Sequence, residues 1–296
     1  MRKPLASDLS AGIDLHVHST ASDGSLTPSQ ILAMADRLGL KAVSITDHDT
    51  LGGSIAAMAA GIPATLAFLT GIEVSAAAPT GCGLNGSIHI LGYGIDPRNC
   101  ALNQLLDVLQ NARKNRNPQI ISRLASLGMA MDTDELASIV GDAVAGRAHI
   151  AQLMVKKGMA HSIDDAFDRF LGRNRPAYVE KFRVPMGDAI AAINQAGGVA
   201  VLAHPHLTGM TDPEAFEAFL LTLQSMGLKG IEAIYPDHPE AATAEYCRLA
   251  LKHNLLITGG TDFHGEVTPG IQMGIGRGGF HVPYALYQAL AANLER

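Results

Sequence analysis

The chain of 296 residues contains no tryptophan, 5% aromatic residues and only three cysteines. Without tryptophan or a stripe of aromatic and basic residues, extended binding of single-stranded nucleic acid is disfavoured. The cysteines, Cys82, Cys100 and Cys247, are odd in number and scattered, which argues against a disulfide framework and favours a reducing cytoplasm. They also lack the spacing of a zinc ribbon, so we expect any metal to be held by nitrogen and oxygen ligands.

Long apolar runs are missing as well. No segment offers the roughly 20 uninterrupted apolar residues that a membrane helix requires, and residues 1–10 lack the apolar core and cleavage-like site of a signal peptide. We therefore expect no membrane association. Hydrophobic residues still make up 47% of the chain, and 296 residues suit one barrel with an insertion. The oligomeric state leaves no trace in the sequence.

Strand-like and helix-like segments alternate in two parts of the chain, residues 13–98 and 185–296. Apolar residues on both faces of the strands favour a parallel sheet covered by helices. Thr27 and Pro28 predict the start of the first helix, and Gly39 predicts its end. Seven strands alternating with helices indicate an α/β barrel rather than an open sheet. The expected strands are 13–17, 42–46, 66–74, 87–93, 199–203, 230–234 and 255–258.

Residues 99–184 differ from the rest in pattern and in charge. Leucine and isoleucine recur there at helical spacing, so we expect an all-helical insertion. The insertion carries 12 Lys and Arg against 9 Asp and Glu, whereas the rest of the chain carries 10 against 19. Either an ordinary solvated surface or a basic cover over an acidic cup explains this contrast. The cover would suit an anionic substrate, a short phosphorylated molecule rather than a long polymer.

Six histidines lie within or just after apolar, strand-like runs, and this repeated placement is the strongest functional signal. They are His16, His18, His48, His89, His204 and His264. Neutral imidazole is the commonest metal-ligating side chain, and strand ends direct side chains to a shared mouth. Three carboxylates, Asp23, Glu73 and Asp262, occupy similar positions. We therefore predict a multinuclear metal site.

Local spacing supports parts of this set. His16 and His18 are two residues apart in a strand, so both imidazoles point to one face. Glu73 lies within an apolar strand, where an unpaired charge is costly, and its two oxygens could bridge two metals. Asp47 is expected to orient His48 from behind.

Two further expectations concern turns at the strand ends. Asp49 or Thr50 should cap the next helix. Gly259 and Gly260 should permit the tight turn that brings Asp262 and His264 inward.

Other polar residues are open to more than one interpretation. His206 could contact substrate or be a plain surface histidine. Arg147 could hold a phosphate, since the guanidinium fork matches phosphate oxygens. His149 beside it could be a surface or structural histidine or could belong with Arg147. Weaker phosphate-binding candidates are Arg113, Arg116, Arg173 and Arg175. The remaining histidines, expected to be surface or structural, are His161, His238, His253 and His281.

Taken together, the histidine and carboxylate motifs resemble those of the PHP (polymerase and histidinol phosphatase) family of metal-dependent phosphoesterases. The motifs that carry the resemblance are Asp14-Leu15-His16-Val17-His18-Ser19, Thr46-Asp47-His48-Asp49, Gly71-Ile72-Glu73, His89, Ala203-His204-Pro205 and Thr261-Asp262-Phe263-His264. The resemblance implies a distorted (β/α)7 barrel of mostly parallel strands, formed by residues 13–98 and 185–296. Three metals would lie at the carboxyl ends of the strands, with the insertion 99–184 as a substrate lid.

The resemblance also implies how the ligands are shared among the metals. One metal would be held by His16, His18, Glu73 and Asp262, a second by Glu73, His89 and His204, and a third by Asp23, His48 and His264. Many relatives carry histidine where this chain has Asp23. This harder oxygen ligand favours Mn²⁺, with Mg²⁺, Fe²⁺ and Zn²⁺ as alternatives.

The loop 21–28 and the basic insertion resemble one bacterial branch of the family. Its members remove the 3′-phosphate of nucleoside 3′,5′-bisphosphates, or trim short RNA from the 5′ end. We predict the first activity, giving the 5′-monophosphate, through a hydroxide bound between metals. The expected catalytic residues are Glu73, Asp262, His206 and Asp47, the last two as possible proton relays, and the expected substrate contacts are Arg147, His206, Asp23 and His48.

Several other functions are compatible with the sequence. Within the same chemistry, the alternatives are a 5′-3′ exoribonuclease on short RNA and a histidinol-phosphate phosphatase. From another class, the chain could be a metal-stabilised scaffold, although structural metal sites are usually closed tetrahedra rather than clusters of nine ligands.

Overall fold

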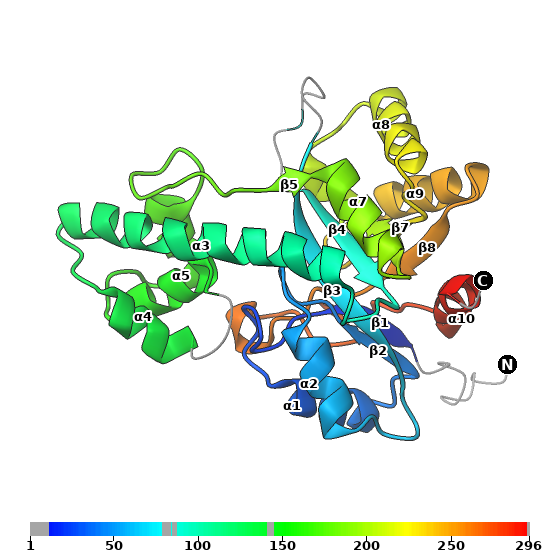
Figure 1. Ribbon diagram of the computed structural model, residues 1–296, viewed down its shortest axis with the longest axis horizontal. Coiled ribbons are helices and arrows are strands. Elements are labelled where there is room, and N and C mark those ends of the chain that lie inside the picture. Colours follow the sequence, from blue (N-terminus) through cyan, green and yellow to red (C-terminus); the bar gives the residue numbers. More distant parts are fainter. Residues whose placement is uncertain (1–11, 79–83, 85–87, 141–144, 295–296) are drawn as a thin grey trace, which may run out of the picture.

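The computed structural model describes residues 12–78, 84, 88–140 and 145–294, and its main sheet curves into a nearly closed barrel (Figure 1). The strands follow the order β1-β2-β3-β4-β6-β7-β8, and β5 pairs with β3 outside this path. Their bounds are β1 (Ile13–Val17), β2 (Ala42–Ile45), β3 (Ala67–Ala77), β4 (Ile88–Tyr93), β5 (Val184–Pro185), β6 (Val199–Leu202), β7 (Gly230–Ile234) and β8 (Leu256–Gly259). All seven predicted strands are confirmed, and so is the α/β barrel.

The two ends of the sheet meet just beyond β8. The backbone N–H of His18 donates to the carbonyl of Phe263 at 2.9 Å, and the N–H of Asp262 donates to the carbonyl of His16 at 2.8 Å. These bonds join the first strand to the segment after the last one. Metal-ligand candidates from opposite ends of the chain therefore lie on neighbouring backbones.

The sheet is parallel except around β4, which runs antiparallel to both β3 and β6. Only residues 78–87 separate β3 from β4, and a parallel connection needs a dozen or more residues, usually with a helix. The alternation rule used for the other strands therefore fails at this one position. It leaves the barrel mostly parallel, as predicted, with one reversed strand.

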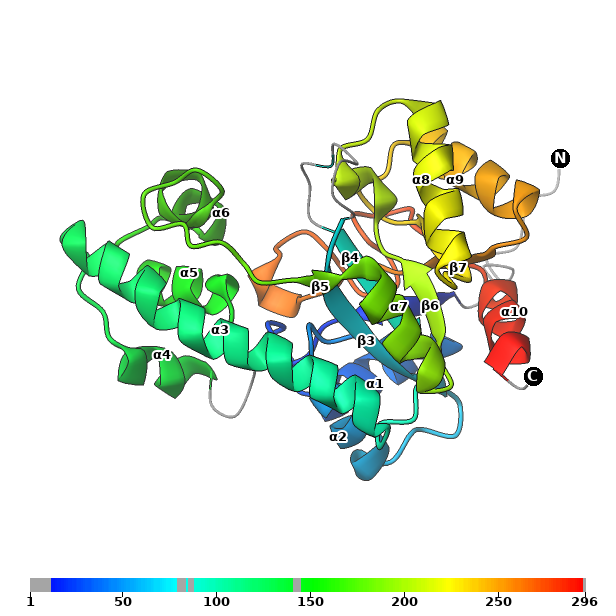
Figure 2. The ribbon, with the colours of Figure 1, turned by 45° about the horizontal axis from the view of Figure 1, so that its top comes forward.

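Among the described elements, six helices cover the outside of the barrel, as Figures 1 and 2 illustrate. Thr27 caps the first of them, since its hydroxyl accepts the N–H of Gln30, and the Gln30 side chain accepts the N–H of Thr27. This confirms the predicted start of that helix. The six helices are α1 (Pro28–Arg37), α2 (Gly52–Ala60), α7 (Met186–Gln195), α8 (Pro213–Ser225), α9 (Glu240–Lys252) and α10 (Tyr284–Leu294).

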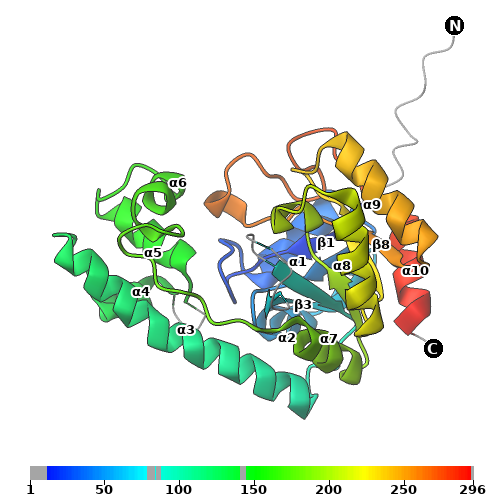
Figure 3. The same ribbon diagram turned by 90° about the horizontal axis from the view of Figure 1, so that it is seen from above.

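A second group of helices lies to one side of the barrel and faces the loops at its mouth (Figure 3). The group comprises α3 (Cys100–Ser126), α4 (Thr133–Val140), α5 (Arg147–Lys156), α6 (Ile163–Ala166) and the π-helical turn η1 (Phe167–Leu171). It has an apolar cluster of its own, in which Ile120, Leu124, Ile150, Met154 and Leu171 are fully buried. Long α3 runs from the barrel into this cluster and joins the two parts.

Cys100 and Cys247 are free thiols, and Cys82 lies outside the described residues. Within the described ranges, no helix combines the length and apolar character that crossing a bilayer demands. The cytoplasmic location inferred from the cysteines stays a prediction.

Candidate metal centre

The structure brings the nine predicted metal ligands together at one end of the barrel. Parallel strands place their carboxyl ends on the same rim, and the reversed strand β4 brings its amino end, with His89, to that rim as well. The nine are His16 in β1, His18 and Asp23 after it, His48 after β2, Glu73 in β3, His89 in β4, His204 after β6, and Asp262 and His264 after β8.

His16, His18, Glu73 and Asp262 form the first group of potential ligands. Nε2 of His18 lies 3.0 Å from Oδ1 of Asp262 and 3.3 Å from Oε2 of Glu73. Nε2 of His16 lies 3.2 Å from Nε2 of His18. Ligand atoms that share an ion at about 2.1 Å lie roughly 3.0–3.4 Å apart in octahedral or tetrahedral geometry. These four side chains therefore have the spacing of one coordination shell.

Glu73 also contacts three further imidazoles. Its Oε1 lies 2.7 Å from Nδ1 of His89 and 2.9 Å from Nε2 of His204, and these two nitrogens are 3.3 Å apart. Its Oε2 lies 2.8 Å from Nδ1 of His48. The carboxylate thus lies between separate groups of nitrogen donors, which is the position of a bridging ligand.

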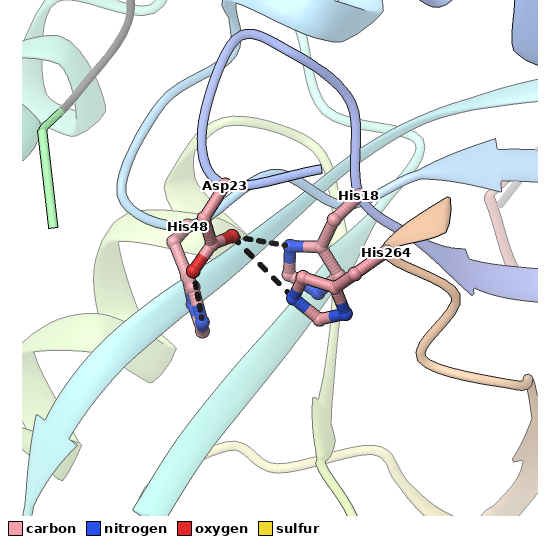
Figure 4. Close-up of side chains that lie close together, drawn as sticks. All are labelled: His18, Asp23, His48 and His264. Atoms are coloured by element: carbon pink, nitrogen blue, oxygen red, sulfur yellow. Dashed lines mark ion pairs between the residues drawn. The ribbon is translucent and has the colours of Figure 1, made fainter. Parts of the chain in front are cut away.

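Asp23 is central to a third group, with His48 on one side and His18 and His264 on the other (Figure 4). Oδ1 of Asp23 lies 3.4 Å from Nε2 of His264 and 3.6 Å from Nδ1 of His18, and its Oδ2 lies 3.9 Å from Nε2 of His48. His18 therefore presents one nitrogen to this group and the other to the first group, an arrangement that the sequence did not predict.

The donor set fits divalent cations. Oδ1 of Asp23, Oε2 of Glu73 and Oδ1 of Asp262 are buried and make no hydrogen bond within the described part of the chain. Burial opposes ionisation of these carboxyls, but neighbouring histidines outweigh it and hold each pKa well below its usual range. Burial likewise lowers the pKa of His18, but Asp262 and Glu73 raise it to about 10. These carboxylates and imidazoles together supply the oxygen and nitrogen donors that divalent cations bind.

Backbone strain marks the same rim. His204 and Asp262 have positive φ angles of 24° and 55°, which residues with a side chain rarely adopt. Such strain persists where the surroundings enforce it and concentrates at functional sites. Gly260 is required for close approach rather than for the predicted turn, because a Cβ there would lie 2.4 Å from the backbone nitrogen of His16.

Glu232 in β7 is a fully buried carboxylate that the sequence analysis missed. Its Oε1 lies 2.9 Å from Nδ1 of His16, and its Oε2 accepts the backbone N–H of His204 at 2.7 Å. A carboxylate behind a ligating imidazole fixes the orientation and tautomer of the ring. The signal was present, because Glu232 interrupts an apolar strand in the way that Glu73 does.

Asp47 has surroundings that differ from the prediction. It accepts hydrogen bonds from the backbone N–H and hydroxyl of Ser19 and from the hydroxyl of Ser22. Within the described residues no hydrogen bond or ion pair joins Asp47 to His48. The Ser22 hydroxyl lies 3.4 Å from Nδ1 of His18, so Asp47 supports the loop after β1 and, through Ser22, the ring of His18.

Asp49 does not cap α2, contrary to one of the two alternatives. The hydroxyl of Thr50 accepts the N–H of Gly52 at the start of that helix. Asp49 instead accepts the N–H of Ser75 at 2.7 Å and forms a buried ion pair with Arg113 of α3. The pair ties the helical group to the strand end that carries His48.

A cavity of about 170 Å³ lies between the metal-ligand candidates and the helical group. Asp23, His48 and His89 line one side. Arg116 on another side is 5% exposed, and its Nε and Nη1 make no hydrogen bond among the described residues. Burial lowers the pKa of Arg116 to about 9 and that of Lys181 to about 7. The basic residues lining this cavity, hereafter the basic cavity, are Arg113, Arg116, Arg147, Lys181 and Arg183.

Arg147, the foremost candidate for phosphate contact, lines the basic cavity. Its Nη1 donates to the carbonyl of Leu171 at 2.8 Å, and its guanidinium lies 5.5 Å from the ring centre of Phe167 and 5.4 Å from that of Tyr178. These contacts hold the guanidinium in place. Two of the weaker candidates, Arg173 and Arg175, are exposed and are not among the residues that line the cavity.

His206 belongs to none of the three groups of potential ligands found among the described residues. It is exposed on the short helix η2 (Pro205–Thr208), where its ring centre is 6.1 Å from that of His238. His206 does not line the basic cavity. Its role as a proton relay or substrate contact stays a prediction.

Comparison with known proteins places these features in a family. The PHP domain model matches residues 14–135. The chain is 32% identical over 273 residues to a 3′,5′-nucleoside bisphosphate phosphatase of Chromobacterium violaceum, covering 89% of this chain and 91% of that protein. It is 31% identical over 251 residues to a 5′-3′ exoribonuclease of Haemophilus influenzae, covering 85% and 89%.

A solved structure from Bifidobacterium adolescentis, described as a metal-dependent phosphoesterase, superposes with a TM-score of 0.85 at 28% identity over 96% of both chains. The similarity therefore extends through the helical group as well as the barrel. By sequence, fold and the geometry of the barrel mouth, the chain belongs to the PHP domain family.

Proposed function

We propose that the protein is a metal-dependent phosphatase that removes the 3′-phosphate of nucleoside 3′,5′-bisphosphates and leaves the 5′-monophosphate. One observation carries the proposal. A cluster of carboxylates and imidazoles suited to cations faces a cavity whose other walls carry five basic side chains. Such a pair of sites suits a substrate with two phosphates, one reacting and one held. The activity of the relative from Chromobacterium violaceum supports the same substrate class.

We propose that the cluster holds up to three ions, with Mn²⁺ or Mg²⁺ preferred because Asp23 adds a hard oxygen ligand to the third group. When bound, such ions stabilise charge on the phosphate oxygens and lower the pKa of water. Glu73 would bridge, since both of its oxygens already face imidazole nitrogens. Glu232 would keep His16 in the orientation that ligation needs.

The helical group would act as the substrate-selecting cover. Arg116 and Arg147 offer guanidinium groups at the basic cavity, and two nitrogens of Arg116 make no hydrogen bond to any described residue. Charge-assisted hydrogen bonds to phosphate are among the stronger polar contacts in proteins. We propose that both arginines hold the phosphate that does not react. In this proposal, residues 99–184 select the substrate, whereas the barrel holds the metal ions.

Phosphate release with added Mn²⁺ tests the proposal. Adenosine 3′,5′-bisphosphate should be hydrolysed much faster than AMP or adenosine 3′-monophosphate, with AMP as the product. AMP lacks the reacting 3′-phosphate, and the 3′-monophosphate lacks the group that the basic cavity would hold. Equal rates on all three would contradict the selective role of the arginines.

A second activity, 5′-3′ exoribonuclease on short RNA, is favoured by the similarity to the protein of Haemophilus influenzae. A 5′-phosphorylated RNA tetramer distinguishes it, because an exonuclease releases mononucleotides whereas a phosphatase leaves the chain intact. Histidinol phosphate belongs in the same assay. Turnover of histidinol phosphate above that of the bisphosphate would replace our proposal by the third alternative.

A further inference from the structure

A larger cavity, of about 410 Å³, lies on the other side of the first turn of α5 from the basic cavity. Barrel loops and the helical group both line it. Gly24 and Ser25 follow the metal-ligand candidate Asp23, and Glu266 follows His264 in the short helix η3 (Gly265–Val267). We call it the α5 cavity. In Figure 3, loops of the barrel mouth face α5.

The walls of the α5 cavity are of two kinds. Ile139, Val140, Ile163 and Val267 provide apolar surfaces, while Gln152 and Glu266 provide hydrogen-bonding groups. Among the described residues that line it there is no lysine or arginine, in contrast to the basic cavity. This composition suits a flat, uncharged ring with polar edges rather than a phosphate. Its volume lies within the range of about 300–1,000 Å³ that is usual for small-ligand sites.

His149 adds a hydrogen-bonding group to the walls of this cavity. It is 6% exposed, and its Nδ1 accepts the backbone N–H of Gly146 at 3.1 Å. Burial lowers its pKa, so the ring is neutral near pH 7. A neutral imidazole that accepts at Nδ1 carries its proton on Nε2. That N–H has no hydrogen-bond partner among the described residues, and it belongs to a side chain that lines the α5 cavity.

We infer that the α5 cavity is the subsite for the nucleobase of the substrate. Nε2 of His149 and the amide of Gln152 would form hydrogen bonds with polar atoms at the edge of the base. The inference rests on the proposed function. Ring nitrogens and carbonyl oxygens of a base accept hydrogen bonds, and the Gln152 amide both donates and accepts. The apolar side chains would cover the faces of the ring.

The position of α5 explains how one molecule could reach both cavities. Arg147 and Ala148 line the basic cavity, whereas His149 and Gln152, from the same helix, line the α5 cavity. The metal-ligand candidates adjoin both, through Asp23 on one side and Gly24 on the other. A nucleotide with its 3′-phosphate at the metals could therefore place its 5′-phosphate and its base on opposite sides of this turn.

The test compares adenosine 3′,5′-bisphosphate with ribose 3,5-bisphosphate, which carries both phosphates but no base. We expect kcat/KM to be at least tenfold higher for the nucleotide. Gln152→Leu, and Ile163→Trp to fill the cavity, should each lower this ratio at least tenfold. Gln119→Leu, at an exposed position on α3, is the matched control and should leave the ratio unchanged.

The possible outcomes separate the two proposals. Equal kcat/KM for the two compounds in the unmodified enzyme would overturn the nucleobase subsite while leaving the phosphatase in place. Variants that slow both substrates equally would also overturn it, since a purely structural role has that effect. Failure to release phosphate from either compound would instead contradict the proposed function.

Discussion

The barrel mouth and the helical group present opposite kinds of buried charge. At the mouth, surrounding histidines lower the pKa of Asp23, Glu73 and Asp262, and one oxygen of each carboxylate makes no hydrogen bond to any described residue. In the basic cavity, burial lowers the pKa of Arg116 and of Lys181. Among the described residues, no carboxylate forms a hydrogen bond or an ion pair with Arg116. One region thus favours added cations and the other an added anion. Metal ions and a phosphorylated substrate together would satisfy both.

The largest expected effect comes from removing the negative charge of Glu73, the carboxylate that faces more than one group of potential metal ligands. Glu73→Gln should lower kcat on the bisphosphate by on the order of 1,000-fold, because several kcal/mol of charge stabilisation depend on bound metal ions. Phosphate release at saturating Mn²⁺ measures kcat, and titration calorimetry measures how many metal ions bind. Glu240→Gln, exposed on α9, is the control. Unchanged metal stoichiometry and activity in Glu73→Gln would contradict the bridging role.

A substitution of Glu232 tests whether the hydrogen bond to His16 contributes to metal affinity. Glu232→Gln should weaken metal affinity by about 10- to 100-fold, the usual effect of losing a partner of a ligating histidine. Titration calorimetry with Mn²⁺ measures the affinity. Because Glu232 acts through His16, excess metal should restore most of kcat. A loss of kcat that excess metal does not restore would show that Glu232 does more than position the ring.

Arg116 tests the basic region. Arg116→Gln should lower the preference for adenosine 3′,5′-bisphosphate over adenosine 3′-monophosphate by about tenfold, since a hydrogen bond to a charged group contributes roughly 1.5 kcal/mol or more. It should also raise the melting temperature of the substrate-free protein, because an unpaired buried charge is removed. Arg37→Gln on α1 is the exposed control. A variant with unaltered preference would place the second phosphate elsewhere.

The smallest effect concerns pH. Burial, followed by the charge of Arg113, lowers the pKa of Lys181 to about 7. The ammonium group is therefore lost as pH rises through 7, and KM for the bisphosphate should rise a few-fold between pH 6 and 8. Lys181→Met should flatten this dependence while keeping other pH effects. Parallel profiles for the two enzymes would exclude Lys181 from phosphate binding.

Much of the site could be predicted because its signals are local. Side chains two apart in a strand share a face, and parallel strands end on one rim, so His16, His18 and His48 could be assigned to a cluster from their spacing alone. A charge inside an apolar strand identified Glu73. The same reasoning would have identified Glu232, which lies in a strand whose bounds were predicted correctly.

Other features depend on which segments meet. Asp49 reads as a helix cap in sequence, yet its partner is Arg113, 64 residues away. Asp47 reads as a partner of His48, yet it binds Ser19 and Ser22. The antiparallel direction of β4 follows from the short connection between β3 and β4. The alternation of strands and helices in the sequence did not predict this direction.

The sequence by itself determined the ligand types, most strand positions and the basic character of the insertion, because these follow from residue chemistry and short-range periodicity. Tertiary structure alone decided how His18 is shared between two groups, which carboxylate supports His16, and which buried arginine has nitrogens that bond to no described residue. It also created the α5 cavity, whose walls come from loops and helices that meet only when the chain is packed. Such contacts form only where segments distant in sequence pack together, and the spacing of residues within one segment does not predict which segments will meet.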